Sequence, residues 1–237
     1  MSTREALVQL RQVTKDYRGL RPLRVDVLDL RQGQVLALVG FDQVTAEVLV
    51  DLITGAVVPD TGDVSVFGEP TTSIADRTAW LQTLDQFGLL TERAVLVEQL
   101  TVEQNLAIPF SLALEDLPSD VRSRVAQLAE EIGFAPTDLM RQTGSLPPAG
   151  RLRVRLGRAL AMRPKVLLAE HPNATLAPDE ATAFAADLLR IVKGRGIAAL
   201  VLTADHAFAR AAADDVLVLE PATGTLQPSS GWRRWFS

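Results

Sequence analysis

The second half of the chain alternates helical patterns with short, fully apolar strands, and this alternation constrains the fold more than any other feature. Residues 151–162 and 179–192 have apolar side chains at helical spacing, whereas residues 166–169, 198–203 and 216–219 are short apolar runs. Strands that are apolar on both faces are typical of a parallel sheet covered by helices on both sides. We therefore predict an α/β fold with a mainly parallel sheet core.

The first third of the chain predicts an antiparallel β subdomain and a strand–loop–helix unit. Residues 6–13, 24–30 and 64–67 are rich in valine and leucine, and glycines lie in the segments between them. Residues 35–39 form a further apolar strand, and residues 46–54 have helical spacing. A strand that runs into a helix through a short loop is a unit of a parallel sheet.

The middle of the chain predicts a helical subdomain. Residues 74–84 and 102–134 have mostly helical patterns. We therefore expect one domain over residues 1–237, in which residues 1–84 and 151–237 form the core with its β subdomain. Residues 85–150 form the helical subdomain in this interpretation.

Composition excludes several classes of function. The 237 residues carry a net charge of −5 with 47% hydrophobic content, so no basic field is available to hold nucleic acid. The chain has no cysteine and two histidines, which excludes disulfides and thiol catalysis and leaves little for a metal centre. No apolar run approaches the roughly 20 residues of a membrane-spanning helix. We expect no metal site and only peripheral association with a membrane.

Segments in fixed order resemble the ATP-binding cassette, the nucleotide-binding subunit of ABC transporters. Residues 34–40 resemble the strand that enters the phosphate loop, and residues 52–64 the stretch after its helix. Residues 100–105 resemble the segment after the glutamine loop, and residues 157–168 the helix and strand before the second phosphate motif. The resemblance covers nearly the whole chain.

This resemblance implies the fold, the partners and the location of the chain. It implies an ABC-type P-loop NTPase fold, a transmembrane permease as partner, a second cassette in a homo- or heterodimer, and a cytoplasmic position at the inner face of the membrane. By position, residues 91–100 and the helix at 102–117 are the segments that it implies for permease contact.

The phosphate loop (Walker A) is degenerate in this chain. Such a loop needs glycine N–H groups around the phosphates, a lysine for the β and γ phosphates, and a hydroxyl for Mg²⁺. Aligned on Gly40, the later glycines become Gln43 and Thr45, the lysine becomes Ala46 and the hydroxyl residue becomes Glu47. Loss of the lysine removes a charge-assisted bond of about 1.5–3 kcal/mol. Because Glu47 also repels phosphate, binding of ATP and Mg²⁺ is disfavoured.

A helix N-terminus attracts negative charge, so the chain itself can replace the phosphate. Asp42 and Glu47 carry carboxylates in and before the first turn of the expected helix. We therefore interpret this segment as a helix capped by Thr45, with internal negative charge, rather than as a catalytic loop.

The second phosphate motif is altered too. Glu170 takes the position of the metal-binding aspartate in the family, and His171 that of the general base. A neutral imidazole can accept a proton. Without a lysine and a metal to position the γ-phosphate, we interpret His171 as a residue at the entry of a helix.

The family signature Leu-Ser-Gly-Gly-Gln is also lost. The corresponding residues are Leu146, Pro147, Pro148, Ala149 and Gly150. Two prolines remove N–H donors and the hydroxyl is missing, so we expect this chain to complete a partner's site poorly. We interpret Arg151, Arg153, Arg155 and Arg158, which follow, as members of structural pairs rather than as an anion site.

The remaining family positions are changed except one. Glu92 aligns with the metal-sensing glutamine, Ala177 with the aspartate of the dimer-contacting loop and Ala204 with the γ-phosphate-sensing histidine. His206 lies two positions later, and we expect it to be exposed. Tyr17 takes the position of the aromatic residue that stacks on adenine, although packing explains a lone tyrosine equally well.

The C-terminal residues 231–236, Gly-Trp-Arg-Arg-Trp-Phe, combine aromatic and basic side chains. This composition suits a membrane interface or a partner groove, and it equally suits a tail packed on the domain surface.

Three functional hypotheses follow from these residues. The first is a catalytically inactive cassette, a pseudo-ATPase that docks on a permease and on a competent cassette. The second is a weak ATPase in which Glu170 and His171 act together while the main chain of residues 41–48 holds phosphate. The third is a regulatory module that binds an adenine nucleotide through Tyr17 without hydrolysis.

Overall fold

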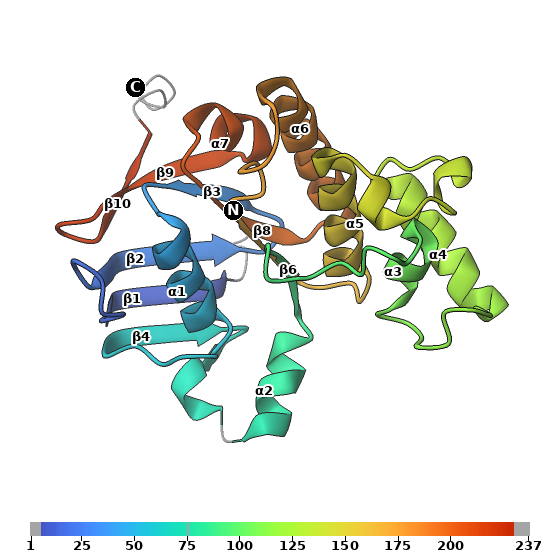
Figure 1. Ribbon diagram of the computed structural model, residues 1–237. Coiled ribbons are helices and arrows are strands. Elements are labelled where there is room, and N and C mark those ends of the chain that lie inside the picture. The colour runs from blue at the N-terminus through green and yellow to red at the C-terminus, as the bar shows by residue number, and fades with distance from the viewer. Residues whose placement is uncertain (1–5, 75, 230–237) are drawn as a thin grey trace.

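The central feature of the computed structural model, which describes residues 6–74 and 76–229, is a six-stranded sheet (Figure 1). Its strands, in spatial order, are β10 (Thr225–Pro228), β9 (Asp215–Glu220), β3 (Val35–Val39), β8 (Ala198–Thr203), β7 (Val166–Glu170) and β6 (Phe87–Leu90). All neighbours pair in parallel except β10, which is antiparallel to β9. The predicted α/β class is confirmed. The aromatic and basic segment at residues 231–236 lies outside the described residues.

A second, four-stranded sheet is antiparallel and lies at the N-terminus of the chain. Its order is β2 (Leu23–Arg31), β1 (Ala6–Lys15), β4 (Thr61–Val66) and β5 (Glu69–Pro70). Leu10 pairs with Leu28 on one side and with Val64 on the other, so these buried side chains share one face. Alternation of buried and exposed residues in β2 is the pattern of an antiparallel sheet with one solvated face. The predicted antiparallel β subdomain is confirmed.

The two faces of the six-stranded sheet bury two separate hydrophobic cores. Leu36 and Leu38 of β3 pack toward the antiparallel sheet and helix α1 (Gln43–Ile53). Val35, Ala37 and Val39 point to the opposite face, where α6 (Pro178–Arg195) and α7 (His206–Ala212) pack. Since successive residues of a strand face opposite sides, a run without polar residues is what this doubly covered position requires.

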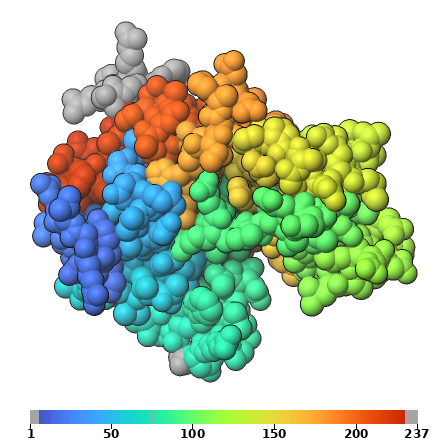
Figure 2. Space-filling view, in the orientation of Figure 1, coloured from blue at the N-terminus to red at the C-terminus, as the bar shows by residue number. Residues whose placement is uncertain are grey.

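The helices between β6 and β7 pack on one another and extend to one side of the sheets. They are α3 (Val102–Ala107), α4 (Ser119–Glu131) and α5 (Pro148–Leu160), and we name them the helical arm. The space-filling view shows the arm as a lobe beside the two sheets (Figure 2). A short helix, α2 (Arg77–Leu84), precedes β6, and 3₁₀ turns occupy Thr71–Ser73, Pro136–Asp138 and Thr143–Ser145.

Strand β6 corrects the expected start of the helical region at residue 85. Phe87–Leu90 pairs in parallel with β7 and is therefore part of the core sheet. A four-residue apolar run cannot be assigned to a strand or a helix from its periodicity alone. Gly88 is needed here because a Cβ atom would lie 2.4 Å from the Ala159 carbonyl oxygen.

Close packing within the arm depends on a glycine of α5. A Cβ atom on Gly157 would lie 2.5 Å from Leu106 Cδ2 of α3 and 2.7 Å from Ile132 Cδ1 at the end of α4. Within residues 6–74 and 76–229, no helix has the length and apolar character to cross a bilayer.

Candidate functional site

The altered phosphate motifs converge at the carboxyl ends of the parallel strands. Gly40 follows β3, Thr91 follows β6, and Glu170 ends β7. In open α/β sheets this edge is where ligands bind, and helix α1 begins there. The sequence-predicted positions of the phosphate loop and of the second phosphate motif are therefore brought together by the fold.

Helix α1 begins with an internal cap instead of a phosphate cradle. Asp42 is the N-cap residue, and its carboxylate accepts a hydrogen bond from the Thr45 N–H at 2.8 Å. The Thr45 hydroxyl in turn accepts from the Asp42 N–H at 2.9 Å. The expectation that Thr45 caps the helix is wrong, because the helix begins at Gln43 and Thr45 lies within its first turn.

Asp42 supplies the negative charge that the helix N-terminus attracts. Hydrogen bonds from the Thr45 N–H and hydroxyl lower the pKa of Asp42 below its usual value of 3.8, and the nearby His171 lowers it further. Glu47 lies beyond the first turn, where its carboxylate accepts from the Gln43 amide at 3.0 Å. The carboxylate of Asp42 thus takes the place that an anionic ligand has at such a helix.

Ala46 faces the core rather than a ligand. Its exposed fraction is 0%, and it packs in the cluster that contains Leu49 and Ile53. Gly40 retains its positive φ of 98°, which lets the chain pass close to Leu219. The position of the family's lysine is therefore buried beneath the sheets. Alignment of the loop residues alone does not predict this burial.

Glu170 is a fully buried carboxylate held by an arginine. Its side chain is 0% exposed, and it accepts a hydrogen bond from Arg93 Nη2 at 2.5 Å. Arg93 also contacts Asp51 of α1, with 3.1 Å between Nη1 and Oδ1. Burial raises the pKa of Glu170 above its usual value, and the neighbouring Glu47 raises it further, whereas Arg93 and the Thr91 hydroxyl oppose the rise.

Arg93 is the site residue that sequence reasoning missed. It follows Glu92, which aligned with the metal-sensing glutamine and whose side chain is exposed. Arg93 is 42 residues from Asp51 and 77 residues from Glu170, so no local pattern joins the members of this network. The only signal in the sequence is a cation three residues after the end of strand β6, at the edge where Glu170 ends β7.

His171 lies next to Glu170 and has a left-handed backbone, with φ of 42°. Its N–H donates to the Leu202 carbonyl at 2.8 Å, so the main chain is fixed by β8. The Nε2 atom of His171 is buried without a hydrogen-bonding partner, and so are Glu170 Oε2 and Arg155 Nε. These residues line a small cavity of about 10 Å³ between β6, β7 and α5.

The signature position begins α5 without a side-chain cap. Pro147 is the N-cap residue and Pro148 the first helical residue, and both are exposed. Leu146 is buried at 4% exposure, and its carbonyl accepts from Arg151 Nη1 at 3.1 Å. Ala149 and Gly150 complete the first turn. Proline is compatible with the first helical position, so the two prolines do not disturb the start of α5. Because proline has no N–H group, they leave this segment with few hydrogen-bond donors.

The arginines of α5 mostly form the structural pairs that their sequence pattern predicts. Arg153 pairs with Asp187 at 2.5 Å, and Arg158 Nη1 donates to the Val95 carbonyl at 2.8 Å. Arg155 differs, because its Nε atom is one of the unsatisfied buried atoms.

The other family positions take no part in the ion pairs of Arg93, although Ala204 follows β8 at the same edge of the sheet. Ala177 is the exposed N-cap of α6, Ala204 is exposed after β8, and His206 begins α7 and is exposed as predicted. The ring of Tyr17 covers Gly19 of its own turn, since a Cβ atom on that glycine would lie 2.4 Å from Tyr17 Cε2. Tyr17 also packs against the core beside the antiparallel sheet, which favours its packing role.

These residues do not fit MgATP. The start of α1 is capped by Asp42, the lysine position is buried, and Arg93 is engaged with two carboxylates. Glu47 and Glu170 add negative charge where triphosphate would have to lie. Within the described ranges, no group of three or more acidic or histidine side chains is arranged to hold a metal ion.

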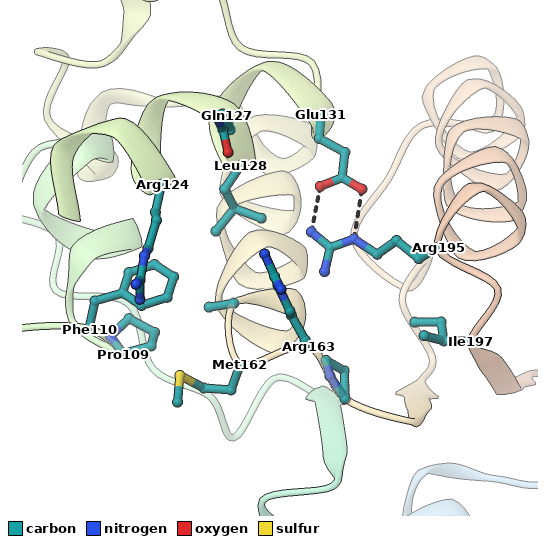
Figure 3. A pocket seen from close by; sticks show the side chains of 12 residues that line it. Pro109, Phe110, Arg124, Gln127, Leu128, Glu131, Met162, Arg163, Arg195 and Ile197 are labelled. Carbon is teal, nitrogen blue, oxygen red and sulfur yellow. Dashed lines mark hydrogen bonds and ion pairs between the residues drawn. The ribbon is translucent and has the colours of Figure 1, made fainter. Parts of the chain in front are cut away.

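A second candidate site is a groove between the helical arm and the sheet, which we name the arm groove (Figure 3). Its volume is about 810 Å³. Apolar side chains line it from the segment after α3 (Pro109, Phe110), from α4 (Leu128), from the turn after α5 (Met162) and from the segment between α6 and β8 (Ile197).

Charged side chains surround this apolar lining. Arg195 donates through Nε to Glu131 at 2.7 Å and contacts it again through Nη2, so this pair joins the end of α6 to α4. The Arg124 guanidinium lies 5.9 Å from the centre of the Phe110 ring. Arg163 projects into the same groove (Figure 3). Three arginines and one glutamate give the groove a positive balance.

Solved structures share this fold. The chain superposes with a TM-score of 0.80 on cbiO1 from Clostridium perfringens, described as part of the ABC transporter complex cbiONQ, with 22% identity over 94% of this chain and 87% of that one. A dimeric bacterial ABC transporter cassette, MJ0796, gives a TM-score of 0.74 with 20% identity, over 93% of this chain and 96% of that one.

Sequence relatives agree with this assignment. A methionine import ATP-binding protein of Pseudomonas fluorescens is 27% identical over 90% of this chain, and this chain spans only 64% of that relative's length. A lipoprotein-releasing system ATP-binding protein of Alcanivorax borkumensis is 27% identical over 88% of this chain and 92% of its own. Residues 23–174 match the profile of the family described as ABC transporter. The chain therefore belongs to the ABC transporter family, as an ATP-binding cassette domain.

Proposed function

We propose that this chain is a catalytically inactive cassette subunit of an ABC transporter complex, which docks on a transmembrane permease at the inner face of the membrane. The single observation that carries the loss of hydrolysis is the start of α1, where Asp42 caps the helix and Ala46 is buried. A competent cassette as dimer partner would then supply the hydrolysis. Residues 85–150, apart from β6, act as the helical subdomain in this proposal.

Electrostatics supports the same conclusion at the second phosphate motif. Arg93 already neutralises part of the charge of Asp51 and Glu170, so it is not free to bind a γ-phosphate. Moving it to a ligand would leave Glu170 buried without its cation, which is unfavourable for an ionised carboxylate. A bound triphosphate therefore has to compete with an internal ion pair.

The arm groove is the surface that we assign to the permease. It uses Phe110, within the segment 102–117 that the family resemblance implied, and adds α4 and the turn after α5. Its apolar lining and positive rim favour an amphipathic segment with acidic side chains, because like charges at such an interface are disfavoured. The relatives named above are described as acting in methionine import and in lipoprotein release.

Calorimetric titration of the purified chain with MgATP and ADP, near physiological salt, tests the loss of nucleotide binding. The expected result is no binding heat at millimolar nucleotide, whereas binding at micromolar concentration would contradict the proposal. The lipoprotein-releasing relative, purified in parallel, is the positive control. ATP turnover by a reconstituted complex in which this chain is the only cassette would contradict the proposal equally.

A weak ATPase is the alternative that one observation favours, because Glu170 and His171 do lie together in the same small cavity. In that case His171→Ala abolishes ATP turnover. An unchanged rate of ATP hydrolysis in this variant would contradict the weak ATPase hypothesis. An adenine-sensing role through Tyr17 has less support, since its ring packs on Gly19. Protection of Tyr17 fluorescence by adenine nucleotides would be the sign of such a role.

A further inference from the structure

We propose that the cavity between Arg155, Glu170 and His171 is a binding site for one water molecule, and that this water joins the helical arm to the central sheet. The cavity lies between β6, β7 and α5 and has a volume of about 10 Å³. A cavity of roughly this size is at the lower limit for a single water molecule, and such water requires several polar partners.

Three buried atoms provide these partners. Arg155 Nε, Glu170 Oε2 and His171 Nε2 have no hydrogen-bonding partner among the described residues. The Glu170 side chain is 0% exposed, so bulk solvent does not reach its free oxygen. The Thr91 hydroxyl contributes a hydrogen bond that opposes the rise in the pKa of Glu170, while Oε2 itself is left without a partner. Buried polar groups in folded proteins are nearly always satisfied by protein or by ordered water.

The chemistry of the three atoms selects water over an ion. Arg155 Nε can only donate, an ionised Glu170 Oε2 can only accept, and His171 Nε2 does either according to its tautomer. A water molecule accepts from Arg155 and donates to Glu170, and it keeps one donor and one acceptor site, so that it suits either tautomer of His171. An anion would be repelled by Glu170, and a cation would be repelled by Arg155.

This site places Glu170 at the junction of two connections. One carboxylate oxygen accepts from Arg93, which also holds Asp51 of α1. The other oxygen is unsatisfied, and Glu170 lines the same cavity as Arg155 of α5, a helix that packs on α3 and α4. Through the water, the arm is coupled to β7 by the chain's own side chains, and this coupling does not require a bound nucleotide.

A crystal structure of the full chain at a resolution that shows ordered water tests the site directly. We expect one density peak within hydrogen-bond distance of all three atoms, about 2.7–3.2 Å. A direct hydrogen bond between His171 and Glu170, or an empty cavity, would overturn the proposal. A peak with the coordination of a metal or halide would overturn the choice of water.

Amide hydrogen exchange of the full chain tests the coupling. Arg155→Met keeps the length of the side chain and removes the Nε donor, so amides of α5 should exchange about three- to tenfold faster, which corresponds to one hydrogen bond. Arg122→Met, on α4 with 58% of its side chain exposed, is the matched control and should change α5 exchange less than about twofold. Equal effects of both variants would refute the coupling.

Discussion

Arg93 donates to the buried Glu170 carboxylate at 2.5 Å across 77 residues of sequence, which joins the loop after β6 to the end of β7. The Glu170 side chain is 0% exposed while 44% of the Arg93 side chain is exposed, so the pair has one dry and one solvated partner. Water can solvate the arginine but not the carboxylate. Replacement of Arg93 should therefore lower the stability of the protein, because it leaves the buried Glu170 carboxylate without its cation.

Arg93→Met should lower the free energy of unfolding at neutral pH by about 1–3 kcal/mol, the range for leaving a buried acceptor unsatisfied. Arg93→Lys should recover part of this loss, since it retains the charge without the two-pronged geometry. Urea unfolding at pH 7 measures both. Arg77→Met, at an exposed position of α2, is the control, and a similar loss there would contradict a specific role of Arg93.

Glu170→Gln should change how stability depends on pH. The pKa of Glu170 is raised in the folded protein, mainly by burial, so the folded state binds its proton more tightly than the unfolded state. The contribution of Glu170 to stability therefore falls as pH rises from the usual value of 4.5 through the raised folded value. Glutamine does not titrate, so the free energy of unfolding of the variant should rise relative to that of the wild type as pH rises across this range.

Unfolding free energies measured between about pH 4 and about pH 8 give this difference. Glu69→Gln, at an exposed position of β5, should leave the curve parallel to that of the wild type. A Glu170→Gln curve that also runs parallel to the wild type would mean that the pKa of Glu170 is not raised.

Asp42→Ala should destabilise the protein by about 1 kcal/mol at neutral pH through loss of the N-cap. The pKa of Asp42 is lowered by its hydrogen bonds to Thr45, so this stabilisation is present above the ordinary value of 3.8 and is lost as pH falls through the folded value. Thermal unfolding at neutral and acidic pH checks both statements. Asp116→Ala, in an exposed loop before α4, should have little effect at either pH.

Gly157→Ala should destabilise the helical arm by about 1–3 kcal/mol, because its Cβ would overlap Leu106 and Ile132. Gly194→Ala is the matched change on α6, where nothing lies within 4 Å of the added atom. It should stabilise by about 0.4–1 kcal/mol, since alanine reduces the entropy of the unfolded chain. Calorimetric unfolding distinguishes them, and shifts of the same sign would contradict the packing described for α5.

Met162→Glu should weaken binding to the permease about tenfold or more, because it places a carboxylate in the apolar lining of the arm groove. Met162 is 62% exposed, so the change should leave the fold intact. Met140→Glu provides the control, because Met140 is 71% exposed and lies outside the groove lining. Affinity for the detergent-purified permease is the measurement, and equal binding by both variants would exclude the groove as the docking surface.

The parts of the fold that sequence predicts well are those with one dominant pattern. Val35–Val39 is buried at every residue, so its apolar run could only be a covered strand. Phe87–Leu90 was missed because a short apolar run before a helical region carries no period of its own. The helix at residues 178–195 was anticipated because its apolar spacing spans several turns and Gly196 ends it in the left-handed conformation.

Of the candidate site, the sequence predicts only which family residues are missing. The missing lysine and the two signature prolines can be read directly from the sequence. The Arg93–Glu170 pair cannot, because it arises from the parallel pairing of β6 and β7. Apolar spacing places the start of α1 at residue 46 instead of Gln43, because the first turn carries few apolar side chains, although Asp42 followed three residues later by Thr45 is itself a capping pattern.

The early start of α1 also bears on reversibility. A lysine restored at position 46 would enter the tightly packed interior beside Leu49 and Ile53, where an unpaired ammonium is strongly disfavoured. To turn it toward solvent, the first turn of α1 would have to unwind and give up the Asp42–Thr45 contacts. A lysine introduced at position 46 thus lowers the stability of the fold, whichever of the two positions its side chain takes.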